Sequence, residues 1–363
     1  MTRPDFSLVL VGDSASQGSG KGSRRRWKTN YSVCSGRRSS VAEPDGGTMS
    51  RKGMGLPKVR DHRAFERFLV DTGRLLQEHE FSSIEEANAF LQSVTVSGSI
   101  PHVAAATPLE QAQDLMYEAW GASGKRRVKL ARQALEISGD CADAYVLLAE
   151  ESAQSLEEAR DLYEQGTKAG ERALGPEAFK EYAGDFWGAL ETRPYMRARA
   201  GLANTLWTLG EDQQAIAHYT ELLRLNPGDN QGLRYCLASV LQGIGDDEAL
   251  GRLLRQYKDD VSADWAYTRT LWVFRHEGVG SKANRALLKA LETNAYVPFY
   301  LFGLRKLPRR PPDTIGFGDE SEAVAYVGGA IRAWCETPGA LEWVADYMVK
   351  HEPGPPRKLP AKP

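Results

Sequence analysis

The chain has 363 residues, of which 42% are hydrophobic and 26% are charged, so it is long enough to bury a sizeable core. Its formal net charge of −2 conceals an asymmetry, because residues 1–60 contain 12 Lys or Arg against 4 Asp or Glu. The remaining residues, with 34 basic and 44 acidic side chains, form an acidic body that disfavours contact with a nucleic-acid backbone.

The longest apolar run near the start is Leu8–Val11, which is too short for a signal-peptide core or a membrane span. No later segment approaches eighteen apolar residues. The cysteines lie too far apart in sequence for a CxxC pair or a zinc site. We therefore expect a cytoplasmic protein without a membrane segment.

Residues 1–58 are rich in Ser, Gly, Arg and Pro and show no sustained apolar period, so we expect a disordered basic tail. Its run Arg24–Lys28, with Tyr31 nearby, combines basic and aromatic side chains that can contact phosphates and stack on bases. A nucleic-acid-associated protein that acts through this tail is therefore the alternative function.

Helical spacing of apolar residues begins at Phe65, and Ser82 or Ser83 can cap a second helix. This pattern predicts an N-terminal helical unit and linker over residues 59–107. From Pro108 to residue 350 the chain shows one helical pattern after another, separated by short Gly, Asn, Asp or Pro breaks.

Within this helical region we expect an extra helix over residues 176–195 and C-terminal capping helices over 320–335 and 338–349. Residues 351–363 contain five prolines and are predicted to form a second disordered tail.

A repeat of 34 residues is the strongest signal in the sequence. The interval separates three sets of residues: Ala215, Ala249 and Ala283; Tyr219, Leu253 and Leu287; and Asn226, Asp260 and Asn294. A small residue suits the close crossing of two antiparallel helices, and a larger apolar residue one turn later fills the adjacent space. The repeat predicts an all-α fold built from equivalent helix pairs.

The segment Leu202–Pro227 resembles the tetratricopeptide repeat, with Ala203 at its small position, Gly210 in its turn and Asn226 near its end. The resemblance covers residues 125–295 and implies an α-solenoid over residues 108–350. The run Asp185–Arg197, followed by these repeats, resembles bacterial proteins similar to suppressor of tumorigenicity 7. That second resemblance implies a tetratricopeptide-like scaffold and no catalytic residue.

In a tetratricopeptide array the first helix of each pair lines a concave groove. The resemblance therefore implies a partner-binding groove whose expected residues are Arg197, Asn204, Arg234, Tyr235, Trp265, Arg269 and Trp272. The alternative is that the tryptophans belong to the core and the arginines pair with acids of neighbouring repeats. A clamp for a chaperone tail is not expected, because Ala200 stands where that clamp needs lysine.

No catalytic, cofactor-binding or metal site is expected. The stretch Leu8–Ser23 departs from a phosphate-binding loop at Ala15 and Gly22, and no histidine has a second ligand at metal-site spacing. Acid pairs such as Glu157 and Glu158 fit helix N-termini, where negative charge is favoured. The sequence therefore predicts a non-enzymatic scaffold or adaptor that binds a peptide or helix of a partner protein in its concave groove.

Overall fold

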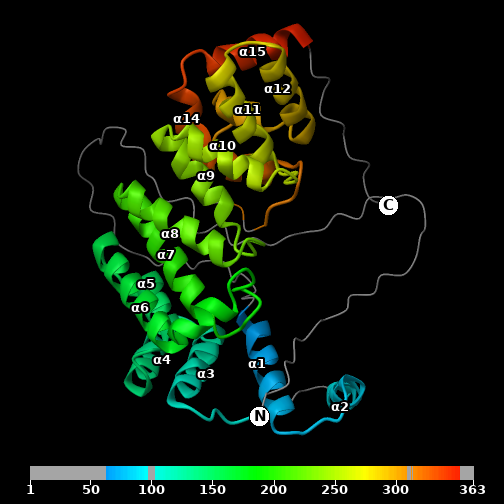
Figure 1. Cartoon of the computed structure of the whole chain (residues 1–363). Helices are drawn as coiled ribbons and strands as arrows, with labels where there is room; N and C mark the ends of the chain where they lie inside the picture. The colour runs from blue at the N-terminus through cyan, green and yellow to red at the C-terminus, as the bar shows by residue number, and fades with distance from the viewer. Residues whose placement is uncertain (1–62, 97–102, 309–311, 313, 352–363) are drawn as a thin grey trace.

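The protein is all-α over residues 63–96, 103–308, 312 and 314–351, which are the residues that the computed structural model describes (Figure 1). No strand occurs in these ranges. The two expected tails, including the run Arg24–Lys28, lie outside them apart from His351. The helices are α1 Arg63–Gln77, α2 Ile84–Val96, α3 Pro108–Gly121, α4 Lys125–Ile137, α5 Ala142–Glu151, α6 Leu156–Glu181, α7 Arg193–Leu209, α8 Asp212–Leu225, α9 Leu233–Ile244, α10 Asp247–Gln256, α11 Ala263–Glu277, α12 Ser281–Thr293, α13 Val297–Leu301, α14 Glu320–Cys335 and α15 Ala340–His351.

Local sequence signals set many helix ends. Helix α3 starts with a capping box, in which the Thr107 side chain accepts from the Glu110 amide and the Glu110 side chain accepts from the Thr107 amide. Helices α7 and α9 end at Gly210 and Gly245, which adopt left-handed φ angles of 85° and 74°. Glycine takes this conformation without the steric cost that a Cβ would add.

From α3 to α12 the helices form successive antiparallel pairs, each packed against the next along the chain. We call α3, α5, α7, α9 and α11 the first helices and their partners the second helices. Each first helix also contacts the next first helix, as α5 contacts α7 and α9 contacts α11. The first helices therefore form a continuous row.

The 34-residue register falls on equivalent places in the last three pairs. Ala215 and Ala283 are fully buried near the starts of α8 and α12, and Ala249 is partly buried near the start of α10. The larger residues of the register, Tyr219, Leu253 and Leu287, are all buried. Asn226 and Asn294 cap the C-terminal ends of α8 and α12, whereas Asp260 lies beyond the end of α10, which is capped by Tyr257.

The extra helix expected over residues 176–195 is wrong beyond residue 181. Gly175 has a φ of 67° and Pro176 follows it, so the helical path breaks inside α6 and ends at Glu181. Residues 182–192 form turns, in which the amides of Gly184 and Phe186 donate to the Leu225 carbonyl at 2.9 and 3.2 Å. The segment is therefore fixed against the end of α8, and α7 begins only at Arg193.

Two helices from outside the repeated pairs pack on the first helices. Helix α1 contacts α3, and α14 contacts both α9 and α11 (Figure 1). Helix α14 thus differs from a simple end cap, because it crosses two first helices. Helix α15 packs beside the last pair, where Trp343 stacks on Phe274 and donates to Asn284.

Within the described ranges, none of the helices combines the length and the apolar character needed to cross a bilayer.

Candidate helix-binding surface

Arg197 of α7 connects three helices through its guanidinium group. Its Nε and Nη2 atoms donate to the two oxygens of Asp143 on α5 at 2.7 and 2.6 Å. Its Nη1 atom lies 2.9 Å from both oxygens of Glu66 on α1. A single arginine therefore joins two neighbouring first helices to a helix that lies outside the repeated pairs.

These groups are largely removed from water. Asp143 is 0% exposed and Glu66 is 7% exposed, and a buried charge is tolerated only when it is paired and hydrogen-bonded. Gln113 donates to Asp143 at 2.8 Å, and the Arg197 guanidinium lies 5.4 Å from the centroid of the Trp120 ring. The carboxylates and the arginine thus have several partners each.

Electrostatics keeps Arg197 charged. Burial alone would lower the pKa of its guanidinium, but the carboxylates of Asp143 and Glu66 outweigh this effect and raise it. A second cation, Arg193, lies 3.5 Å from Glu66. Glu66 is therefore placed between two arginines of α7.

The other end of α1 is held by charges of the opposite sign. Arg74, in the last turn of α1, lies 3.0 Å from both oxygens of Asp114 on α3 and donates to the Val103 carbonyl at 3.4 Å. An acid in the first turn and a base in the last turn also suit the dipole of α1 itself. We call the receiving residues, Asp114, Asp143, Arg193 and Arg197, the α1-binding surface.

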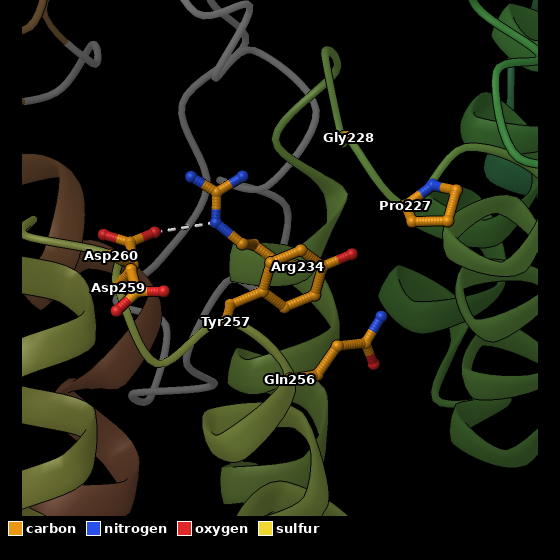
Figure 2. Close-up of a pocket in the computed structure, with 7 residues that line it drawn as sticks. All are labelled: Pro227, Gly228, Arg234, Gln256, Tyr257, Asp259 and Asp260. Atoms are coloured by element: carbon orange, nitrogen blue, oxygen red, sulfur yellow. Dashed lines mark hydrogen bonds and ion pairs between the residues drawn. The ribbon is translucent and has the colours of Figure 1, made fainter.

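Arg234 forms a second charged cluster, on α9. Its Nε donates to Asp260 at 2.7 Å and its Nη1 donates to Asp229 at 2.8 Å. Arg234 and Asp260 line a pocket of about 280 Å³. Figure 2 shows the two residues joined, with Pro227 and Gly228 on the other side of the pocket. The residues lining this pocket are Pro227, Gly228, Arg234, Gln256, Tyr257, Asp259 and Asp260.

The pocket beside Arg234 is not suited to an anion, because Asp259 and Asp260 line it together with a single guanidinium group. Burial, assisted by the charge of Asp229, raises the pKa of Tyr257 to about 12, so its hydroxyl stays protonated at neutral pH. Within the described part of the chain this hydroxyl has no hydrogen-bond partner. The pocket therefore has no excess cation with which to bind an anion.

Two of the residues expected in the groove belong to the core. Tyr235 and Trp265 are 7% and 1% exposed, and their ring centroids lie 5.8 Å apart in an edge-to-face arrangement. Arg234 lies over the Tyr235 ring at 4.3 Å. Arg234, Tyr235 and Trp265 thus form one cluster, held together by ring packing and by the ion pairs of Arg234.

Arg269 and Trp272 of α11 both contact α10. Arg269 is exposed and donates to the Leu254 carbonyl at 3.1 Å, whereas the half-buried Trp272 donates to the Asp247 carbonyl at 2.7 Å. Asn204 is half-buried on α7. The expected residues therefore occupy separate places: Arg197 in the α1-binding surface, Arg234, Tyr235 and Trp265 in one cluster, and Arg269 and Trp272 against α10.

Sequence reasoning missed Glu66, Asp114 and Asp143. One signal was available in the sequence, because Asp143 is a carboxylate within the apolar sequence of α5 and lies between the buried residues Ala142 and Ala144.

Over the described residues no group of three or more His, Cys, Asp or Glu side chains is placed to hold a metal ion.

Residues 102–185 match the family model of the ST7 protein, and this stretch includes α3 to α6 with Asp114 and Asp143. No tetratricopeptide family model matches the chain. The sequence-based resemblance to suppressor of tumorigenicity 7 is confirmed to this extent, and the tetratricopeptide resemblance stays a prediction.

Individual relatives show the same similarity. The chain is 30% identical over 261 residues to the suppressor of tumorigenicity 7 protein-like of Bos taurus and to that of Homo sapiens, with 64% of this chain and 46% and 44% of those proteins covered. It is 29% identical over 258 residues to the protein ST7 homolog of Drosophila melanogaster, with 63% of this chain and 47% of that protein covered. The chain therefore spans less than half the length of these relatives.

Proposed function

We propose that the protein is a non-enzymatic scaffold, built as a tetratricopeptide-like α-solenoid, that binds a peptide or helix of a partner protein along its first helices. One observation carries the proposal: Arg197, on a first helix, holds α1 through the buried carboxylate of Glu66. Because α1 is not part of the repeated pairs, this contact supports the idea that the row of first helices binds separate helices.

Helix α14 supports the same idea at the other end of the row. Its buried carboxylate, Glu322, accepts from the Ala263 amide at the start of α11 at 2.9 Å and from the Asn294 side chain at 3.0 Å. The Gly318 amide donates to the same carboxylate at 2.7 Å. Both helices that pack on the row thus carry one buried glutamate that meets fixed donors.

Arg269 is the expected groove residue that remains most available to a partner, since it is exposed and has one hydrogen bond to a backbone carbonyl. Arginine is enriched at binding hot spots, where truncation typically costs about 2 kcal/mol or more of affinity. We therefore expect Arg269 to contribute to the partner-binding surface.

The test compares the tagged full chain with Arg269→Ala and with Arg285→Ala, an exposed arginine on the second helix α12. Recovery of cross-linked protein partners and the melting temperature are measured for all three. The proposal expects lower recovery with Arg269→Ala at an unchanged melting temperature, and full recovery with Arg285→Ala. Equal recovery by all three chains would contradict the use of this face.

A further inference from the structure

We propose that the α1-binding surface is a docking site for a partner's helix and that α1 is its displaceable occupant. The inference rests on the proposed scaffold function and specifies the kind of partner. The partner is an amphipathic helix with a carboxylate in its first turn and an arginine or lysine eight residues later. Helix α1 has this pattern in Glu66 and Arg74.

The charges of the α1-binding surface explain why the bound helix must carry a carboxylate. Among the described residues other than those of α1, the surface presents two cations, Arg193 and Arg197, and one buried anion, Asp143, which pairs with Arg197. Glu66 supplies the remaining negative charge. If its place were empty, a nearly buried guanidinium group would lose a charged partner, which is strongly unfavourable away from water. The surface is therefore suited to a helix that delivers one carboxylate at this point.

The second charge selects the direction of the bound helix. Asp114 lies opposite Arg74, and eight residues of α-helix separate Arg74 from Glu66 by roughly 12 Å. A helix bound in the reverse direction would place its basic side chain near Arg197 and its acidic side chain near Asp114. Like charges would then repel at both contacts, so the surface binds a helix in one orientation.

The contact made by α1 has the character of an exchangeable interface. Among the α1 side chains that the structure describes, the buried ones are Glu66, Asp71, Thr72 and Leu75, of which only Leu75 is apolar. Permanent interfaces are more hydrophobic than this, whereas interfaces that form and dissociate are more polar. Phe68 of α1 is 42% exposed, so the helix is not enclosed.

The test uses the full chain with Glu66→Arg and Arg74→Glu combined. Residue 66 then repels Arg197 and residue 74 repels Asp114, and this repulsion is expected to release α1. The probe is a fluorescently labelled peptide with the sequence of residues 63–77. Fluorescence anisotropy is expected to show saturable binding to this variant that is at least tenfold tighter than to the unaltered chain, where α1 competes. The same peptide with Glu66→Gln should bind the variant at least tenfold more weakly.

Circular dichroism and hydrogen exchange accompany the titration, and Arg74→Glu alone serves as a milder variant. In a folded variant, amides of residues 66–77 should exchange at least tenfold faster while those of α7 to α12 remain protected. Absence of peptide binding to both folded variants would overturn the inference. Unfolding of both variants would also overturn it, because an occupant that can leave cannot be required for folding.

The peptide derives from this chain, so its binding requires no other protein. Failure of the peptide titration therefore refutes the docking site alone. Failure of the Arg269→Ala comparison refutes the wider scaffold proposal instead, and the two results are distinguishable.

Discussion

Glu66 and Arg197 are separated by 131 positions in the sequence, yet both oxygens of the glutamate lie 2.9 Å from one nitrogen of the arginine. The other two nitrogens of the same guanidinium group donate hydrogen bonds to Asp143. The site thus depends on residues from three distant segments, and removing any one of them should affect the others.

Asp143→Asn is expected to lower the free energy of unfolding by about 3–5 kcal/mol, because it leaves the buried Arg197 with one charged partner fewer. Urea unfolding followed by circular dichroism measures the change. Glu118→Gln is the control, since Glu118 pairs with Arg126 at an exposed position where an ion pair contributes at most about 1 kcal/mol. Equal effects of the two substitutions would show that the buried pair has no special importance.

Enlarging the crossing residues should have unequal effects. Ala215→Leu and Ala283→Leu are expected to destabilise the protein by about 1–3 kcal/mol, because both alanines are fully buried and leave no space for added methylene groups. Ala249→Leu should cost less, because Ala249 is only partly buried. Thermal melts give the ranking, and an Ala249→Leu variant that melts lowest would contradict it.

Two glycines within helices should respond to alanine with opposite signs. A Cβ at Gly170 would lie 2.8 Å from the Cβ and 3.0 Å from the Cα of Tyr195, so Gly170→Ala forces the helices apart and destabilises. Gly243, in α9, has open space where its Cβ would stand. Gly243→Ala should therefore stabilise by about 0.5–1 kcal/mol through helix propensity. Chemical unfolding of both variants checks the signs.

Asp264 should make stability depend on pH. Burial, and then the charges of Asp260 and Glu322, raise its pKa well above 3.8, although Arg234 and a hydrogen bond with Thr268 oppose the shift. The folded state therefore holds a proton that the unfolded chain releases near pH 3.8. This contribution to stability is complete below that pH and is lost as the pH rises through the folded pKa.

Asp264→Asn removes this titration, so its free energy of unfolding relative to the unaltered chain should increase as the pH rises from 4 to 8. Unfolding at several pH values measures the difference. The exposed Asp346→Asn corrects for the loss of one negative charge. A difference that stays constant over this range would rule out the proposed ionisation of Asp264.

Much of the helical architecture could be predicted from the sequence. Apolar periodicity located helices such as α14 and α15, and the 34-residue interval placed Ala215 and Ala283 at equivalent buried positions. The segment 182–192 could not be predicted, because hydrogen bonds to the Leu225 carbonyl, rather than local propensity, hold it in turns. Local patterns report only on interactions between neighbours in the chain.

The candidate site was less accessible to prediction for the same reason. Arg197 was identified from its place on a first helix, but nothing local indicates that Glu66 and Asp143 meet it. Trp265 illustrates a second limit, since a helix packed on two sides has apolar residues on more than one face. Its sequence alone does not show which of those faces is a groove.

The separation between Glu66 and Arg197 also fixes an order of events during synthesis. Helix α1 leaves the ribosome before the helix that holds it exists. At about 5–20 residues per second, 131 further residues require roughly 7–26 seconds. Throughout this interval Glu66 has no Arg197 to pair with, and this end of α1 is open to capture by chaperones or by other chains. The contact between α1 and α7 can therefore form only late in synthesis, after the Arg74–Asp114 contact with α3 has become possible.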